Sequence, residues 1–147
     1  MKDNEVIFHK WWKENNIKGF GVIKHEFVLG DARNLLKRDV YDLISLGEKN
    51  TGAGVIGRID TIFKYRGNIY IGEIKYMKAS NDFWDAMKVL GYCEYFKWQT
   101  GMNHVKPAIL MPLKSIKLEH QIVANKLKFK IFAIEKYQDT YILKDMS

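Results

Sequence analysis

Two apolar stretches separated by a short polar turn constrain the fold of this chain more than any other feature. Residues 57–76 read GRIDTIFKYRGNIYIGEIKY, with β-branched and aromatic residues on both sides of an Arg-Gly-Asn sequence at 66–68. This pattern predicts a β-hairpin. Asp60 lies in the first strand, and Glu73 and Lys75 lie in the second. Charged residues are rare in buried strands, so these three need an explanation.

The alternation of side chains along a strand predicts where the three charges point. Glu73 and Lys75 are two residues apart and therefore share a face. If the hairpin turns through two residues, either 66–67 or 67–68, Asp60 lies opposite Glu73 or opposite Lys75, on that same face. A three-residue turn without a bulge would place Asp60 on the other face, so the register tests this interpretation.

Two carboxylates held close together repel each other unless a positive charge lies between them. Hard oxygen ligands suit Mg²⁺ or Mn²⁺, and a water bound to such a metal loses a proton more easily. Lys75 would then orient that water, assist its deprotonation or neutralise charge on a phosphate. The chemistry predicted is in-line hydrolysis of a phosphodiester. The alternative is a solvent-facing Glu-Lys ion pair, which is common on exposed strands.

The rest of the chain predicts a mixed α/β sandwich in one domain spanning 1–147. Before the hairpin we expect a helix over 3–16, a strand over 19–30 that contains Glu26, a helix over 31–45 and a glycine-rich loop over 46–57. After it we expect a helix from about 81 to 100, a strand over 105–113, a helix over 115–128 and one or two strands over 129–144.

Composition narrows the class of partner. The chain has 24 Lys and Arg against 17 Asp and Glu, a net charge of +7 and a pI of about 9.4, which favours a polyanion such as nucleic acid. A single cysteine, Cys93, excludes an intrachain disulfide and a multi-thiolate cluster. No signal peptide or membrane span is evident, so we expect a soluble, intracellular (cytoplasmic) protein with no membrane partner.

The charged hairpin resembles the catalytic motif of the PD-(D/E)xK nuclease superfamily. In that superfamily a variable Asp precedes a Glu/Asp-x-Lys motif across a hairpin, and this chain has RID ending at Asp60, then EIK from Glu73 to Lys75. The resemblance covers about residues 3–113. It implies a restriction-endonuclease-like core of order α-β-β-β-α-β, here with a C-terminal helix and strand extension.

Within the superfamily the sequence is most similar to the RecB and Cas4-like branch. That branch has a Gly-x-x-Asp motif, matched here by GRID, and a helix carrying Gln-x-x-x-Tyr. Lys88 stands where the glutamine is expected, and Tyr92 matches the tyrosine. Cas4-like proteins also carry a four-cysteine iron–sulfur cluster, which a chain with one cysteine cannot build. The resemblance therefore implies Mg²⁺ or Mn²⁺ as cofactor and no iron–sulfur cluster.

The resemblance also assigns roles to individual residues. The metal ligands would be Asp60, Glu73 and the backbone carbonyl of Ile74, with Lys75 catalytic. Glu26 is a further candidate ligand or organiser, on position alone, and a plain surface glutamate is the alternative.

Other residues are candidates for contact with DNA or metal. Lys88, Tyr92 and Arg58 are candidate DNA contacts. His9 and His25 are available for the upstream histidine found in some RecB and Cas4-like enzymes, with a structural or exposed role as the alternative.

These observations lead to one expected function and several alternatives. We expect a metal-dependent deoxyribonuclease acting on DNA, endonuclease or exonuclease, with a homodimer left open. The alternatives are a Holliday-junction-resolving endonuclease of the same superfamily, a non-cutting nucleic-acid-binding protein with a nuclease fold, and an unrelated binding module in which the hairpin is an exposed ribbon.

Overall fold

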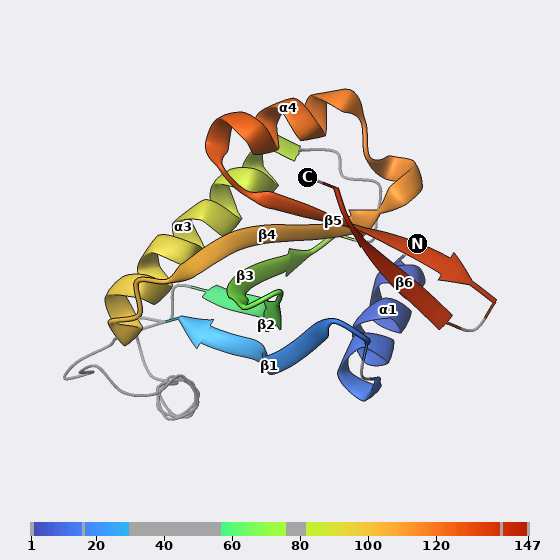
Figure 1. The fold of residues 1–147 in the computed structure, drawn as a ribbon, viewed down its shortest axis with the longest axis horizontal. Helices are drawn as coiled ribbons and strands as arrows, with labels where there is room; N and C mark the ends of the chain where they lie inside the picture. The colour runs from blue at the N-terminus through green and yellow to red at the C-terminus, as the bar shows by residue number, and fades with distance from the viewer. Residues whose placement is uncertain (1, 16, 30–56, 76–81, 139, 147) are drawn as a thin grey trace.

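The computed structural model describes residues 2–15, 17–29, 57–75, 82–138 and 140–146 (Figure 1). The elements are α1 (Lys2–Glu14), β1 (Phe20–Leu29), β2 (Gly57–Tyr65), β3 (Asn68–Ile74), α3 (Asp82–Thr100), β4 (Val105–Pro112), a 3₁₀ turn (Leu113–Ser115), α4 (Leu118–Leu127), β5 (Lys130–Tyr137) and β6 (Thr140–Asp145). The helix expected over 31–45 and most of the loop expected over 46–57 lie outside the described residues. The other elements appear in the predicted order, with their boundaries shifted by a few residues at most.

The six strands form one mixed sheet in the order β1-β2-β3-β4-β5-β6. Strands β1, β2 and β3 are antiparallel neighbours, as are β5 and β6, whereas β3-β4 and β4-β5 are parallel pairs. A parallel pair needs a crossover, and α3 and α4 supply these two. The predicted C-terminal extension is therefore a helix and two strands that enlarge the sheet.

Helices cover both faces of the sheet. Helix α1 packs Phe8 and Trp12 into an aromatic cluster with Phe63 and Phe132, while α3 packs Phe96 into a separate cluster. Figure 1 shows α1 on one side of the strands and α3 and α4 on the other. The glycine-bounded strands and apolar helix stripes therefore form the layered α/β arrangement predicted from the sequence.

A hydrogen bond fixes helix α1 to the middle of β2. The indole Nε1 of Trp12 donates to Oγ1 of Thr61 at 2.8 Å, and both side chains are buried. Because a buried donor without a partner is costly, this bond specifies how α1 lies against the sheet. Thr61 directly follows Asp60, so the contact also supports the part of β2 that carries the charge.

The hairpin turns through two residues, as one of the two predicted registers requires. Tyr65 pairs with Asn68, and the central residues Arg66 and Gly67 have φ values of 47° and 81°. Positive φ at both positions is the geometry of a type I′ turn, which matches the twist of paired strands. The register predicted for a turn at 66–67 is confirmed.

No helix in the described part of the chain is both long enough and apolar enough to cross a membrane.

Candidate active site

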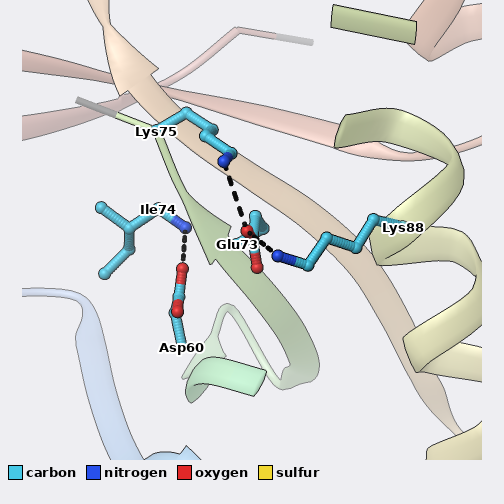
Figure 2. A network of polar contacts seen from close by, with 5 residues as sticks. All are labelled: Asp60, Glu73, Ile74, Lys75 and Lys88. Atoms are coloured by element: carbon cyan, nitrogen blue, oxygen red, sulfur yellow. Dashed lines mark hydrogen bonds and ion pairs between the residues drawn. The ribbon is translucent and has the colours of Figure 1, made fainter. Parts of the chain in front are cut away.

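Asp60 and Glu73 come together at one end of the hairpin (Figure 2). Thr61 pairs with Gly72, so the next step along the hairpin sets Asp60 level with Glu73. The side chain of Glu73 is only 5% exposed, which is unusual for a carboxylate. The carboxyl groups are close enough for an interaction between them to affect the pKa of each.

The carboxylate of Asp60 is bound to the backbone of the neighbouring strand. Its Oδ2 accepts a hydrogen bond from the N–H of Ile74 at 2.8 Å. The described pairing of β2 with β3 ends one step earlier, at Thr61 and Gly72. The Asp60 carboxylate therefore accepts from a backbone N–H, that of Ile74, which has no partner in the pairing of these two strands. Asp60 is therefore held in a fixed position at the point where the two strands separate.

Strand β2 is irregular around this position. Ile59 and Ile62 are three residues apart yet pack in the same hydrophobic cluster, so the alternation of faces shifts by one residue between them. Gly72 of β3 lies alongside, where a Cβ would come within 3.0 Å of the side chains of Phe63 and Thr61. The close approach explains why a residue without a side chain occupies this step of β3.

Two lysines from different elements contact one oxygen of Glu73. Nζ of Lys75, which directly follows β3, lies 3.7 Å from Oε2, and Nζ of Lys88 on α3 lies 3.1 Å from that same atom. Figure 2 shows both ammonium groups converging on Glu73. Lys75 is therefore in the arrangement expected from the Glu-x-Lys spacing. The contact of Lys88 with Glu73 was not predicted.

Burial is the largest cause of the raised pKa values of Asp60 and Glu73. Burial and the adjacent Asp60 raise the pKa of Glu73 to about 7, although Lys88 and Lys75 oppose the shift. Burial also raises the pKa of Asp60, against the hydrogen bond from Ile74 and the charge of Lys88. Partial burial lowers the pKa of Lys88, but the charge of Glu73, its hydrogen bond with Lys88 and the charges of Tyr92 and Asp60 together outweigh burial, so the pKa is raised. Two lysines are thus insufficient to restore an ordinary pKa to Glu73.

Tyr92 connects Lys88 to the start of β2. Nζ of Lys88 lies 5.6 Å from the centroid of the Tyr92 ring, one helical turn along α3. A Cβ on Gly57 would overlap the Tyr92 hydroxyl oxygen, so the tyrosine packs directly against the backbone of β2 at this glycine. The Gly-x-x-Asp and Lys-x-x-x-Tyr motifs, far apart in the sequence, are therefore in direct contact.

Glu26 lies in a different group of charges. It is on β1, has a φ of 55°, and its half-exposed carboxylate forms an ion pair with Lys13 of α1 at 2.7 Å. The hydrogen bond from Lys13 is the main reason that its pKa is lowered, and Arg58 and His9 contribute charge. The structure thus places Glu26 with Lys13 and near Arg58, and not in the contacts that join Asp60 and Glu73.

The histidines considered from the sequence belong to that same group. His25 is half-buried, and its pKa is lowered by burial, then by Lys13 and His9, while Glu26 opposes the shift. We call this set of His9, Lys13, His25, Glu26 and Arg58 the α1–β1 charge cluster. It combines the cations Lys13 and Arg58 with the acidic Glu26 and two histidines, and its members come from α1, β1 and β2.

The oxygen atoms at Asp60 and Glu73 fit a hard divalent cation. The described ranges hold no group of three or more His, Cys, Asp or Glu side chains that suits a metal, and within these ranges the oxygen ligands at this position are two carboxylates and the backbone. In a strand the N–H and C=O of one residue point to the same side, and the N–H of Ile74 points at Asp60. Its carbonyl is therefore directed to that side as well. Mutual repulsion and the raised pKa values are what a cation would relieve.

Sequence reasoning missed the contact of Lys88 with Glu73, although it had identified Lys88 itself. The signal available was the spacing of Lys88 and Tyr92, which places both on one face of a helix. The spacing does not say which strand residue that face meets, because this depends on how α3 is rotated over the sheet.

Comparisons with known proteins support the fold. No family model matches the sequence, and no curated protein matches it. Two solved structures are similar in fold. One is a fdxN element excision controlling factor protein from Anabaena variabilis, with 10% identity, a TM-score of 0.59 and full coverage of both chains. The other is an XisH family protein from Nostoc punctiforme PCC 73102, with 9% identity, a TM-score of 0.55 and 98% coverage of each chain.

At such low identity the likeness concerns the fold alone. Both structures match the chain over essentially its whole length, so they share the arrangement of the sheet and its helices and not a fragment of it. The fold class predicted from the sequence, a restriction-endonuclease-like α/β core with a central mixed sheet flanked by helices, is confirmed.

Proposed function

We propose that this protein is a metal-dependent deoxyribonuclease that hydrolyses phosphodiester bonds at Asp60, Glu73 and Lys75. The observation that carries the proposal is the convergence of a buried carboxylate, Glu73, and a partly buried one, Asp60, whose pKa values remain raised beside two lysines. Removing two neighbouring carboxylates from water costs stability unless a cation compensates them, so a functional role would explain why the pair is present. Perturbed carboxyl groups with defined charge partners are typical of functional sites.

Asp60, Glu73 and the carbonyl of Ile74 would hold the metal. Bound there, Mg²⁺ or Mn²⁺ would polarise the scissile phosphate and lower the pKa of a coordinated water. The hydrogen bond from Ile74 fixes the orientation of Asp60, so this carboxylate needs little rearrangement to act as a ligand. Lys75 is 29% exposed, so its ammonium group is positioned to orient a water or to neutralise charge on the phosphate.

DNA as the substrate is supported by charge. The net charge of +7 favours binding of a polyanion, and the α1–β1 charge cluster adds cationic side chains along an edge of the sheet. Arg58 belongs to this cluster and is exposed, so it remains a candidate contact for the DNA backbone. Lys88 contacts Glu73 and Tyr92 lies beside Lys88, so both are candidate contacts nearer the reacting phosphate.

A second candidate function is nucleic-acid binding without cleavage. The observation that favours it is the contact of Lys88 with Glu73, because an internal ammonium group neutralises part of the site without any metal. In that case the carboxylates would organise lysines for phosphate binding. The two candidates differ in whether the carboxylates are needed for a chemical step.

Incubation of the pure protein with labelled DNA tests both functions. Single-stranded, duplex and branched substrates are each incubated with Mg²⁺, with Mn²⁺ and with EDTA. We expect metal-dependent cleavage that is abolished in Glu73→Ala and in Lys75→Ala, with binding by gel shift largely retained in Lys75→Ala. Selective cleavage of the branched substrate would indicate a junction-resolving enzyme. Binding without cleavage of any substrate would favour the second candidate, and cleavage by the Asp60→Ala, Glu73→Ala and Lys75→Ala variants would refute the site.

A further inference from the structure

The most unusual contact in the site is that of two ammonium groups with one carboxylate oxygen. Oε2 of Glu73 lies 3.1 Å from Nζ of Lys88 and 3.7 Å from Nζ of Lys75. A divalent cation that binds Glu73 would meet both positive charges at short range, and like charges at such distances repel strongly in a buried site. A metal and two lysines therefore cannot all occupy the same side of Glu73 without cost.

The two lysines differ in how they are held. Lys75 is two residues from Glu73 on the same segment, so its backbone position is tied to that of the carboxylate. Lys88 reaches Glu73 from α3, its side chain is 43% exposed, and it also lies over the ring of Tyr92 at 5.6 Å. Water and the aromatic ring can both stabilise the Lys88 ammonium after it leaves Glu73.

We propose that Lys88 is a resident counter-ion of Glu73 that a divalent cation displaces. The inference rests on the metal site of the proposed function and adds a role for Lys88 that differs from simple contact with DNA. Lys88 is a positioning residue in this scheme, because it acts through Glu73. Without metal it neutralises the buried carboxylate. With metal it is released from Glu73 toward solvent, still on the side of α3 that faces the site.

Competition between Lys88 and the metal sets the metal affinity. Each metal ion that binds must first break the ion pair between Lys88 and Glu73. Removal of the lysine charge should therefore strengthen metal binding, while loss of a lysine elsewhere on the helix should not. Lys97 is a matched control because it is also on α3 and also forms an ion pair, with Glu94 at 2.8 Å.

The first test is the affinity for Mn²⁺, measured by isothermal titration calorimetry. We expect Lys88→Gln to bind Mn²⁺ about tenfold more tightly than the wild type, because one repelling charge is gone, and Lys97→Gln to bind as the wild type does. Lys88→Gln keeps a hydrogen-bond donor for Glu73, which protects the fold, and circular dichroism checks it. Equal or weaker binding by Lys88→Gln would overturn the proposal.

The second test needs no variant. The wild-type protein is treated briefly with an amine-acetylating reagent, with and without Mg²⁺, and modification of each lysine is measured by mass spectrometry. We expect acetylation of Lys88 to rise several-fold with Mg²⁺ and that of Lys97 to stay constant. Unchanged or reduced acetylation of Lys88 would show that the metal does not displace it.

The outcomes separate this inference from the nuclease function. Cleavage of DNA by the wild type with no change in Mn²⁺ affinity or Lys88 acetylation would refute the counter-ion role and leave the nuclease intact. Tighter Mn²⁺ binding by Lys88→Gln with no cleavage of any substrate would support the counter-ion role and refute the nuclease. Absence of Mn²⁺ binding in both proteins would refute both.

Discussion

Asp60 and Ile74 are joined by a hydrogen bond in which a side-chain carboxylate accepts the backbone N–H of the adjacent strand at 2.8 Å. A candidate catalytic group is thus also part of the connection between two strands. The bond satisfies the partly buried N–H of Ile74, so Asp60 supports the fold as well as the candidate site. A substitution that keeps the hydrogen bond and one that removes it should therefore have different effects.

Asp60→Asn should keep the fold and lose the chemistry. The amide oxygen still accepts the hydrogen bond from Ile74, but the charge needed for a metal ligand is gone. Asp60→Ala leaves that N–H without a partner, so it should lower the free energy of unfolding by about 1–3 kcal/mol. Urea denaturation compares the two variants, and equal stability of Asn and Ala at this position would contradict the structural role.

The raised pKa of Glu73 predicts a dependence of stability on pH. The folded state holds the proton up to about pH 7, while the unfolded state releases it near 4.5. Between these values the folded protein binds more protons, so the free energy of unfolding falls as the pH rises, by about 3 kcal/mol for this group. Other groups titrate too, and a variant is needed to isolate the effect.

Glu73→Gln provides that comparison. It cannot titrate, so its stability should change less between pH 4.5 and pH 8 than that of the wild type when both are measured by urea denaturation. The contribution of His25, whose pKa is lowered, is common to both proteins and cancels. Parallel pH profiles of the two proteins would show that Glu73 has an ordinary pKa in the folded state.

Gly57→Ala should destabilise the protein through a clash with Tyr92. The added Cβ would overlap the tyrosine hydroxyl, and insertion of a methyl group into a packed contact costs about 1–3 kcal/mol. Tyr92→Phe removes the overlapped oxygen, so the double variant should recover part of the loss. Thermal unfolding of the four proteins of this cycle measures the coupling, and strictly additive effects would argue against the contact.

The bond between Trp12 and Thr61 should contribute measurably to stability. Thr61→Val keeps the shape of the side chain but leaves the buried indole N–H unsatisfied, for an expected loss of about 1–3 kcal/mol. Trp12→Phe removes the donor as well, so adding Thr61→Val to it should cost little. Urea denaturation gives both values, and an equal cost of Thr61→Val in the two backgrounds would contradict the bond.

Glu26→Gln tests whether Glu26 has a part in the candidate site. Its ion pair with Lys13 is largely exposed, so the substitution should change the free energy of unfolding by less than about 1 kcal/mol. If the metal is held without Glu26, this variant should cut DNA at the wild-type rate. A loss of Mg²⁺-dependent cleavage comparable to that of Glu73→Ala would restore Glu26 as a candidate ligand.

The hairpin could be predicted from the sequence because its determinants are local. Glycine at 67 permits the positive φ of a two-residue turn, and that turn sets the register that brings Asp60 level with Glu73. The contact of Lys88 with Glu73 could not be predicted in this way. It depends on the rotation of α3 over the sheet, which many packing contacts decide together.

The sequence left two roles open for Glu26, for a different reason. Strict alternation along 19–30 assumes regular backbone, whereas β1 changes register after Val22 and has a positive φ at Glu26. Each irregularity changes where the following side chains point. The apolar pattern predicts the strand but does not reveal such a step, so it leaves open whether Glu26 is a ligand or a surface glutamate.

The two-residue turn at 66–67 has a consequence for the order of folding. Hairpins with short turns close within microseconds, whereas the parallel pairing of β3 with β4 must wait for a crossover that contains the whole of α3. We therefore expect the carboxylates of Asp60 and Glu73 to meet during folding before helix α3 brings Lys88 to them. Until α3 packs, the two carboxylates of the hairpin repel each other, and Lys75 is the nearest positive charge. Acidic conditions that protonate the carboxylates should therefore speed formation of the hairpin.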